Sequence, residues 1–367
     1  MKKILKILGA VTLVLLVLSL IFTAATYIFH SIKTNQELEL LREEGYYNPV
    51  SVGDYSLNVA KFGNENGKHT IVGLAGLGMG DYAVTARQMT APLEEDNLVV
   101  FVDRAGYGFS DDTDKDMTLE LIVEDYRKAL KNAGIEGPYI LMPHSIGGAY
   151  ANYWASNYPE EIEGIVFVDG SQLSEDAFVE EADGEVGFVD RALAFLSGIG
   201  FGRYVIREYC YLYPDNYTAK DQTLGDGLSL LTLDSIAPIS ESYLLQQNAI
   251  DAFRGIITND IPKMYICASW GFSTVDEITE YNKWVNRQIE INDIDSPGFP
   301  TEYEGNEELL DDLLNAYKEA QREIIYPYAE KMGNCQVVLL PGDHMIYQQR
   351  PDDCGKLILE FIDQLDK

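Results

Sequence analysis

Histidine, cysteine and basic residues are scarce in this sequence. The 367-residue chain contains 4 His, 4 Cys, and 27 Lys and Arg against 59 Asp and Glu, which gives a net charge of −32. A field of that sign repels phosphates and argues against a nucleic-acid partner. Four Cys without a CxxC pair, and His residues that stand singly, match neither a disulfide scaffold nor a zinc site. We therefore expect no metal and no cofactor.

A long uncharged run occupies the amino end. Lys2, Lys3 and Lys6 precede residues 7–29, which contain no charged side chain. As a helix, this run would be about 34 Å long, enough to cross a bilayer. The basic cluster places residues 1–6 in the cytoplasm by the positive-inside rule. We predict a single-pass cell-membrane protein held by this helix, with a stalk over residues 30–47 and the remainder extracytoplasmic.

A cleaved signal peptide is the alternative interpretation of this run. Residues 23–25, Thr-Ala-Ala, offer small side chains for a cut. The apolar run is longer than an ordinary signal core, which favours the uncleaved anchor. Residues 1–36 hold four Lys and no acid, so the rest of the chain carries −36. A surface this anionic suits a soluble body.

From about residue 48 the chain alternates between strand-like and helix-like segments. Short apolar strand candidates that alternate with helices predict a mostly parallel sheet with helices on both faces. The strand candidates are residues 55–62, 70–74, 98–103, 139–142, 164–169, 264–268 and 336–340. The helix candidates are residues 81–93, 119–133, 146–157 and 353–364.

Two stretches interrupt this alternation. Residues 170–260 are too long for a simple crossover, and residues 270–333 are very acidic, with apolar residues at helical spacing from residue 307 onward. Insertions of this kind usually cover the carboxyl ends of the strands. We predict a core over residues 48–169 and 261–367, a cap or lid over 170–260, and an acidic helical insertion over 270–333 within the core.

A serine lies between a predicted strand and a predicted helix. Residues 143–148 read Pro-His-Ser-Ile-Gly-Gly, and the serine is Ser145. A serine on such a sharp turn is held in a strained conformation with its hydroxyl exposed above the sheet. Gly147 and Gly148 let the turn close. We predict that Ser145 is a nucleophile; a serine that only caps the helix is the alternative.

A serine nucleophile needs a base, and elimination among four histidines leaves one candidate. His30 lies at the membrane boundary, His69 opens a strand far upstream, and His144 shares the tight turn with Ser145. His344 follows the last predicted strand, at the same carboxyl edge of the sheet as Ser145. We predict that His344 is the base; an ordinary surface histidine is the alternative.

Two backbone N–H groups could hold the oxyanion that forms when a carbonyl is attacked. Ile146 follows the nucleophile directly, and Leu77 lies in a glycine-rich turn after an early strand. This turn does not fit a dinucleotide-binding fingerprint, because Asp81 stands where the third glycine would be.

These motifs together resemble the α/β-hydrolase fold family of serine hydrolases. They occur in the family's order across residues 50–367 at positions 75–78, 103–110, 144–148 and 342–344. The resemblance implies an α/β-hydrolase fold with a helical cap. In this sequence the predicted membrane helix precedes that fold. It implies Ser145 as nucleophile, His344 as base, and Leu77 and Ile146 as oxyanion donors.

The sequence departs from the family pattern at the triad acid and at Pro143, which stands where the elbow usually has Gly. After the penultimate strand, where many members carry the acid, none occurs before Asp276. The other position known in the family is the end of the strand after the elbow helix, where Asp169 fits. We expect Asp169 to be the acid, because a strand tip positions a carboxylate better than an insertion does.

The resemblance implies hydrolysis of a small-molecule acyl ester, in the manner of a carboxylesterase or lipase. A serine rather than an aspartate nucleophile disfavours the epoxide hydrolase and haloalkane dehalogenase branches. A peptidase like the proline iminopeptidases is the second hypothesis. A non-catalytic membrane receptor or scaffold on the same fold is the third. No pattern in the sequence indicates an oligomeric state.

Overall fold

Eight strands form one sheet in the computed structural model, which describes residues 2–174, 184–204, 216–291, 303 and 305–367. The order across the sheet is β1-β2-β4-β3-β5-β6-β7-β8; β1 and β2 pair antiparallel, as do β2 and β4, and the other pairs are parallel. The mostly parallel sheet is as predicted. The strands are β1 (Pro49–Ser51), β2 (Ser56–Gly63), β3 (Thr70–Leu74), β4 (Leu98–Val102), β5 (Tyr139–Ser145), β6 (Ile162–Gly170), β7 (Lys263–Cys267) and β8 (Cys335–Leu339).

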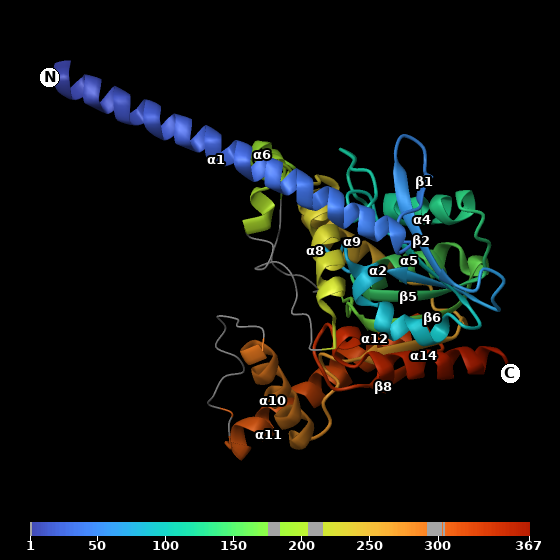
Figure 1. The fold of residues 1–367 in the computed structure, drawn as a ribbon. Helices are drawn as coiled ribbons and strands as arrows, with labels where there is room; N and C mark the ends of the chain where they lie inside the picture. The colour runs from blue at the N-terminus through green and yellow to red at the C-terminus, as the bar shows by residue number, and fades with distance from the viewer. Residues whose placement is uncertain (1, 175–183, 205–215, 292–302, 304) are drawn as a thin grey trace.

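Helices cover both faces of the sheet because successive strand side chains point to opposite sides. In β3, Val72 and Leu74 join one buried cluster and Ile71 joins the other. The first cluster packs under α4 (Leu119–Asn132), α5 (Gly147–Asn157), α9 (Ala237–Gly255) and α12 (Tyr326–Met332). The second packs under α2 (Tyr82–Thr85), α3 (Arg87–Thr90), α13 (Ile346–Gln349) and α14 (Pro351–Leu365). Figure 1 labels α4, α5, α9 and α12 of the first group and α2 and α14 of the second.

One predicted helix is broken in the structure. The segment expected as a helix over 81–93 forms α2, α3 and the 3-10 turn η1 (Ala91–Leu93). Pro92 has no N–H to donate to an α-helical ladder, which accounts for the change from α3 to the 3-10 turn η1. The separation of α2 from α3 lies at Ala86, whose ψ of −6° departs from that of an α-helix. The remaining short turns are η2 (Pro159–Glu161) and η3 (Phe201–Tyr204).

The predicted cap region contributes both to the core and to a separate layer. Its helices are α6 (Phe188–Gly198), α8 (Ala219–Leu233) and α9. Ala249 and Ala252 of α9 are fully buried in the cluster under α5, so this end of the region packs with the core. The cap boundary at residue 260 stays a prediction.

The acidic insertion forms a smaller helical layer. It contains α10 (Val275–Ile291), α11 (Glu307–Ala320) and a π-helical turn, η5 (Gln321–Ile325), that leads into α12. This layer has a small hydrophobic core of its own, which consists of Phe272, Ile278, Leu310 and Leu314. Cys335 and Cys354 are both free thiols.

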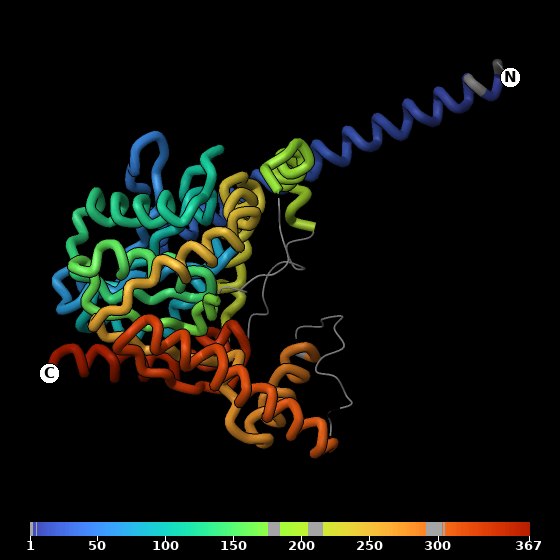
Figure 2. Tube along the Cα trace, turned by 180° about the vertical axis from the view of Figure 1, so that it is seen from behind, coloured from blue at the N-terminus to red at the C-terminus, as the bar shows by residue number. Residues whose placement is uncertain are grey.

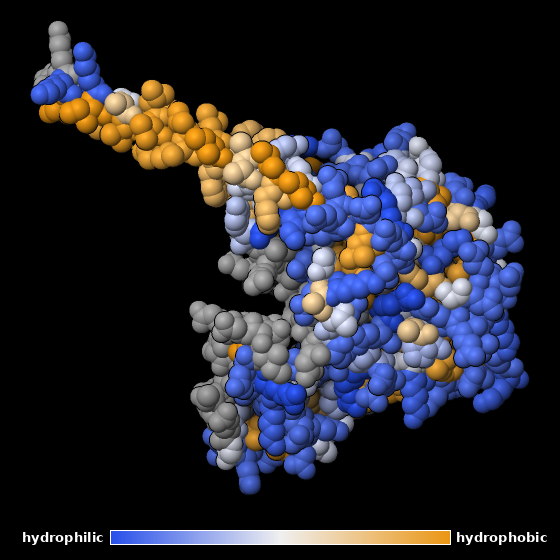
Figure 3. Space-filling view, in the orientation of Figure 1, coloured by the Kyte–Doolittle hydropathy of each residue, from blue (hydrophilic) through white to orange (hydrophobic). Residues whose placement is uncertain are grey.

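The amino-terminal helix α1 (Lys2–Glu43) joins the predicted span and stalk without a break. It projects from the body, with the chain start at its far end (Figures 1 and 2). Its apolar surface forms an unbroken band away from a largely hydrophilic body (Figure 3). By length and composition this helix can cross a membrane, and none of its most apolar 18-residue window is buried.

Candidate active site

Ser145 occupies a strained turn at the carboxyl end of β5. Its φ of 53° lies in the left-handed region, which is costly for a residue with a side chain. The turn is tight because α5 begins at Gly147, where a Cβ atom would lie 2.5 Å from the Leu74 carbonyl oxygen. Gly76 is equally constrained, since its Cβ would lie 2.9 Å from Cβ of Ser145. The glycine-rich turn after β3 therefore lies directly against the serine.

Pro143 is accommodated in this strand although proline is rare inside sheets. On one side it lies opposite Leu74 of β3. On the other side, the recorded partners in β6 pass from Leu141↔Ile165 to His144↔Val168. The pairing of β5 with β6 thus skips Pro143, which has no N–H to donate.

Asp169 and His344 form a hydrogen-bonded pair at the same corner of the sheet. Asp169 lies at the end of β6, fully buried, with a φ of 45°. Its Oδ2 lies 2.8 Å from Nδ1 of the half-exposed His344. The backbone of Ser145 pairs with Gly170, the residue after Asp169. A proton on Nδ1 donated to the carboxylate leaves Nε2 of His344 available as an acceptor.

The carboxylate of Asp169 is itself held in place by the loop after β7. Its Oδ1 accepts hydrogen bonds from the amides of Ala268 and Ser269, at 2.7 and 3.1 Å. Its Oδ2 accepts another from the Ser269 hydroxyl at 2.6 Å. Sequence reasoning did not single out Ser269, because a serine in a loop carries no signal of what it will contact.

His144 supports the loop that carries His344. Its Nε2 lies 2.7 Å from the backbone oxygen of His344, and because a carbonyl only accepts, Nε2 must donate. Burial, followed by the charge of His344, lowers the pKa of His144 to about 3, so the ring is neutral. Nδ1 has no hydrogen-bond partner among the described residues. Neither ring nitrogen of His144 forms a hydrogen bond with the Ser145 hydroxyl among the described residues.

The other residues of interest do not join this pair. Asp276 lies in the first turn of α10, and Asp343 accepts a hydrogen bond from the amide of Met345 at 2.7 Å. Within the described ranges, no hydrogen bond joins Oγ of Ser145 to the ring of His344.

A buried arginine fastens the glycine-rich turn that carries Leu77. Arg104 donates to the carbonyl oxygens of Ala75 and Gly76, each at 2.7 Å. Its Nε donates to Glu241 of α9 at 2.9 Å, and both side chains are almost fully buried. Glu241 in turn accepts from the Tyr150 hydroxyl at 2.6 Å. A charge pair in the core thus determines where the backbone around Leu77 lies.

Removing the charge of Glu241 should destabilise the protein strongly. Glu241→Gln leaves the buried guanidinium of Arg104 without a counter-charge, and we expect the free energy of unfolding to fall by about 3 kcal/mol. Glu280→Gln is the matched control, because Glu280 pairs with Lys283 on an exposed surface, where loss of the pair should cost less than about 1 kcal/mol. Denaturant unfolding of the full chain in detergent measures both. Equal losses in the two variants would contradict this account of Arg104.

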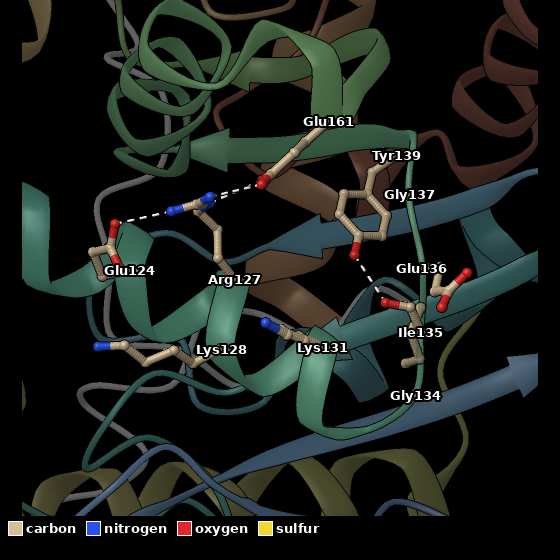
Figure 4. A pocket seen from close by; sticks show the side chains of 10 residues that line it. All are labelled: Glu124, Arg127, Lys128, Lys131, Gly134, Ile135, Glu136, Gly137, Tyr139 and Glu161. Carbon is tan, nitrogen blue, oxygen red and sulfur yellow. Dashed lines mark hydrogen bonds and ion pairs between the residues drawn. The ribbon is translucent and has the colours of Figure 1, made fainter.

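A hollow of about 440 Å³ lies at the opposite edge of the sheet (Figure 4). It is bordered by the end of α4 and by Tyr139, the first residue of β5, whereas Ser145 is the last. Its Arg127 is already paired with Glu161 and Glu124 (Figure 4). The hollow therefore lies at the other end of β5 from Ser145.

Comparison with known proteins identifies the fold. Residues 72–194 match the family model described as the alpha/beta hydrolase fold. The chain is an α/β-hydrolase-fold protein, and the predicted fold class is confirmed.

Three known proteins are similar to this chain in sequence or in structure. Protein YbdG of Bacillus subtilis is 35% identical over 205 residues, which are 56% of this chain and 62% of YbdG, so the chain spans less than two thirds of that relative. A bacterial membrane phospholipase A is structurally similar, with a TM-score of 0.56, 15% identity, and coverage of 96% of this chain and 98% of that one. Acinetobacter baumannii lip1, assigned as a lipase, has a TM-score of 0.55 at 16% identity, over 91% and 96% of the two chains.

Proposed function

We propose that the protein is a serine hydrolase that cleaves carboxylic esters through an acyl-enzyme. His344 Nε2 takes the proton of the Ser145 hydroxyl as Oγ attacks the ester carbonyl carbon. The amides of Leu77 and Ile146 hold the resulting oxyanion. His344 returns the proton to the leaving alcohol, and the C–O bond breaks. Water, deprotonated by His344, then releases the acid and restores Ser145.

The hydrogen bond between His344 and Asp169 carries this proposal. It orients the imidazole with Nδ1 toward the carboxylate, which is the tautomer that a general base acting through Nε2 requires. The strained backbone of Ser145 supports it further, because such strain is found where a nucleophile is presented above a sheet. The similarity to proteins assigned as a lipase and as a phospholipase favours an ester over an amide substrate.

We propose further that α1 anchors the hydrolase in the cell membrane, with residues 1–6 in the cytoplasm and the catalytic body outside. The support is the uncovered apolar surface of the helix and the basic cluster at its start. A cleaved signal peptide is the competing interpretation. The apparent mass of the mature chain distinguishes the two, since cleavage near residue 25 would remove the apolar run.

The test of the ester assignment is a substrate panel with the purified full chain. Soluble esters of increasing acyl length should be hydrolysed, and a fluorophosphonate should inactivate the protein by labelling one serine. Aminoacyl arylamides should be cleaved far more slowly. Faster cleavage of the arylamides would favour a peptidase of the proline-iminopeptidase type. Neither turnover nor labelling would favour a non-catalytic receptor or scaffold.

A further inference from the structure

The surface around α6 has an unusual distribution of apolar side chains. Among the described residues after α1, ten large hydrophobic side chains are exposed, and six of them lie between residues 188 and 204. Five belong to α6, namely Phe188, Val189, Leu193, Phe195 and Leu196. An exposed apolar cluster on an otherwise acidic protein indicates a surface that contacts another molecule or a membrane.

The helix α6 turns its apolar side outward and its small and polar side inward. At about 100° per residue, the five exposed apolar side chains span about 160° of its circumference. Ala194 and Ser197 lie on the remaining side and are buried. Asp190, on that side too, accepts from the Tyr243 hydroxyl of α9 at 3.2 Å. A surface helix of a water-soluble protein has the opposite arrangement, with its apolar side toward the protein and its polar side toward water.

The segment η3, which follows α6, is fastened to α1 by polar contacts. Arg203 donates from its two terminal nitrogens to the two carboxylate oxygens of Glu37, at 3.0 and 2.6 Å. It also donates to the Thr34 hydroxyl at 2.8 Å and to Nδ1 of His30 at 3.0 Å. A bidentate pair of this kind fixes orientation as well as distance.

Aromatic contacts continue toward the start of α1. The rings of Phe201 and Tyr204 lie 6.0 and 6.1 Å from the ring of Phe22. The Tyr204 hydroxyl lies 3.0 Å from that of Thr26. Figures 1 and 2, seen from opposite sides, both place α6 beside α1. Through η3, the helix α6 is therefore held beside the apolar run of α1.

These contacts set a depth. Residue 22 lies about 10 Å along the helix axis from residue 29, where the apolar run ends. A helix that lies in the membrane interface is buried by about 5–10 Å into the boundary between headgroups and acyl chains. With α1 spanning the membrane as proposed, the contacts of η3 run from about 10 Å inside the end of the apolar run, at Phe22, to beyond it, at Glu37, a range that includes the outer bilayer surface.

We infer that α6 is a second membrane-contacting element, with its apolar side in the headgroup layer of the outer leaflet. The inference rests on the proposed anchoring by α1 and does not require the proposed ester hydrolysis. The occupant of this surface is the bilayer itself, because α6 lies beside α1 and η3 contacts α1 within its apolar run at Phe22. Arg191, at the edge of the apolar side, is paired with Asp114 at 2.6 Å, which reduces the cost of bringing this charge to the interface.

Quenching by brominated lipid tests the inference. Phe195→Trp, in the full chain reconstituted in phosphatidylcholine vesicles, adds an indole at a position that is 67% exposed. Bromines near the headgroup end of the acyl chains should quench about half of the added emission, and bromines near the chain ends should quench less. Ile257→Trp is the matched control, because Ile257 is 60% exposed in the loop after α9. Its added emission should be insensitive to either lipid.

The outcomes separate this inference from the proposals beneath it. Equal quenching of Phe195→Trp and Ile257→Trp in protein that sediments with the vesicles would overturn the contact of α6 and leave the anchor in place. Stronger quenching by the deep bromines would overturn the interfacial depth. Failure of the unaltered chain to sediment with vesicles would overturn the anchor and this inference together. None of these measurements depends on turnover, so they do not bear on the ester hydrolase.

Discussion

Replacing Ser145 with alanine should lower kcat for ester hydrolysis by about 10⁴-fold or more, because the variant lacks the hydroxyl that we propose forms the acyl-enzyme. The variant should keep its fold, because alanine retains the Cβ atom of Ser145. Gly76, which has no side chain, leaves room beside that atom. Labelling by a fluorophosphonate should be lost along with turnover. Initial rates with a soluble ester and gel fluorescence of the labelled protein measure the two effects.

Ser171→Ala is the matched control for this substitution. The amide of Ser171 donates to the backbone oxygen of Ser145 at 2.8 Å, and this bond survives the change because it involves only the main chain. The control should therefore keep both turnover and labelling. Equal labelling of the Ser145→Ala variant and the unaltered protein would remove Ser145 from the mechanism.

Asp169→Asn should lower kcat by about 10⁴-fold while leaving the structure intact. The carboxamide oxygen can still accept from the amides of Ala268 and Ser269, so its NH₂ group would be turned toward Nδ1 of His344. That arrangement moves the ring proton to Nε2, and the imidazole can then no longer take the proton of Ser145. KM should change much less than kcat, because Asp169 does not itself contact the substrate.

Asp276→Asn distinguishes the two acids that the sequence offers. Asp276 belongs to the first turn of α10, so its amide variant should retain turnover. Steady-state kinetics of both variants with the same ester provide the comparison. Retained turnover in Asp169→Asn together with loss in Asp276→Asn would reverse the assignment.

Much of the fold could be predicted because the strands are short, apolar and separated by helices. The predicted segment 70–74 coincides with β3, and the other six predicted strands lie within three residues of those observed. The short β1 was missed because Pro49–Ser51 has neither the length nor the apolar content of a core strand. It pairs with β2 at the sheet edge, where proline is tolerated.

The candidate site could be predicted in part because its residues follow strands. Parallel strands bring their carboxyl ends to one edge, so residues after β5, β6 and β8 are expected to meet there. The structure brings Asp169 and His344 together at that edge. Their catalytic roles, and those of Leu77 and Ile146, remain predictions.

The contacts that support the site could not be predicted. Glu241 reaches Arg104 across 137 positions of sequence, and Arg203 reaches Glu37 across 166. Each is a lone charged residue in a helical segment, where most such residues are solvated. These charged residues meet only because α9 and η3 pack where they do in three dimensions. The sequence near each residue does not indicate its partner.

The unbroken course of α1 has a mechanical consequence. A protein joined to its anchor by a loose tether can tumble freely at the membrane surface. Here a helix of 42 residues continues from the apolar run into the body, where Leu41 is fully buried. Arg203 also forms hydrogen bonds with His30 and Glu37 of this helix. If α1 spans a bilayer and the protein hydrolyses esters, as proposed, this rigid connection would hold the body at one height and orientation, and the search for membrane-bound esters would be a lateral one in two dimensions.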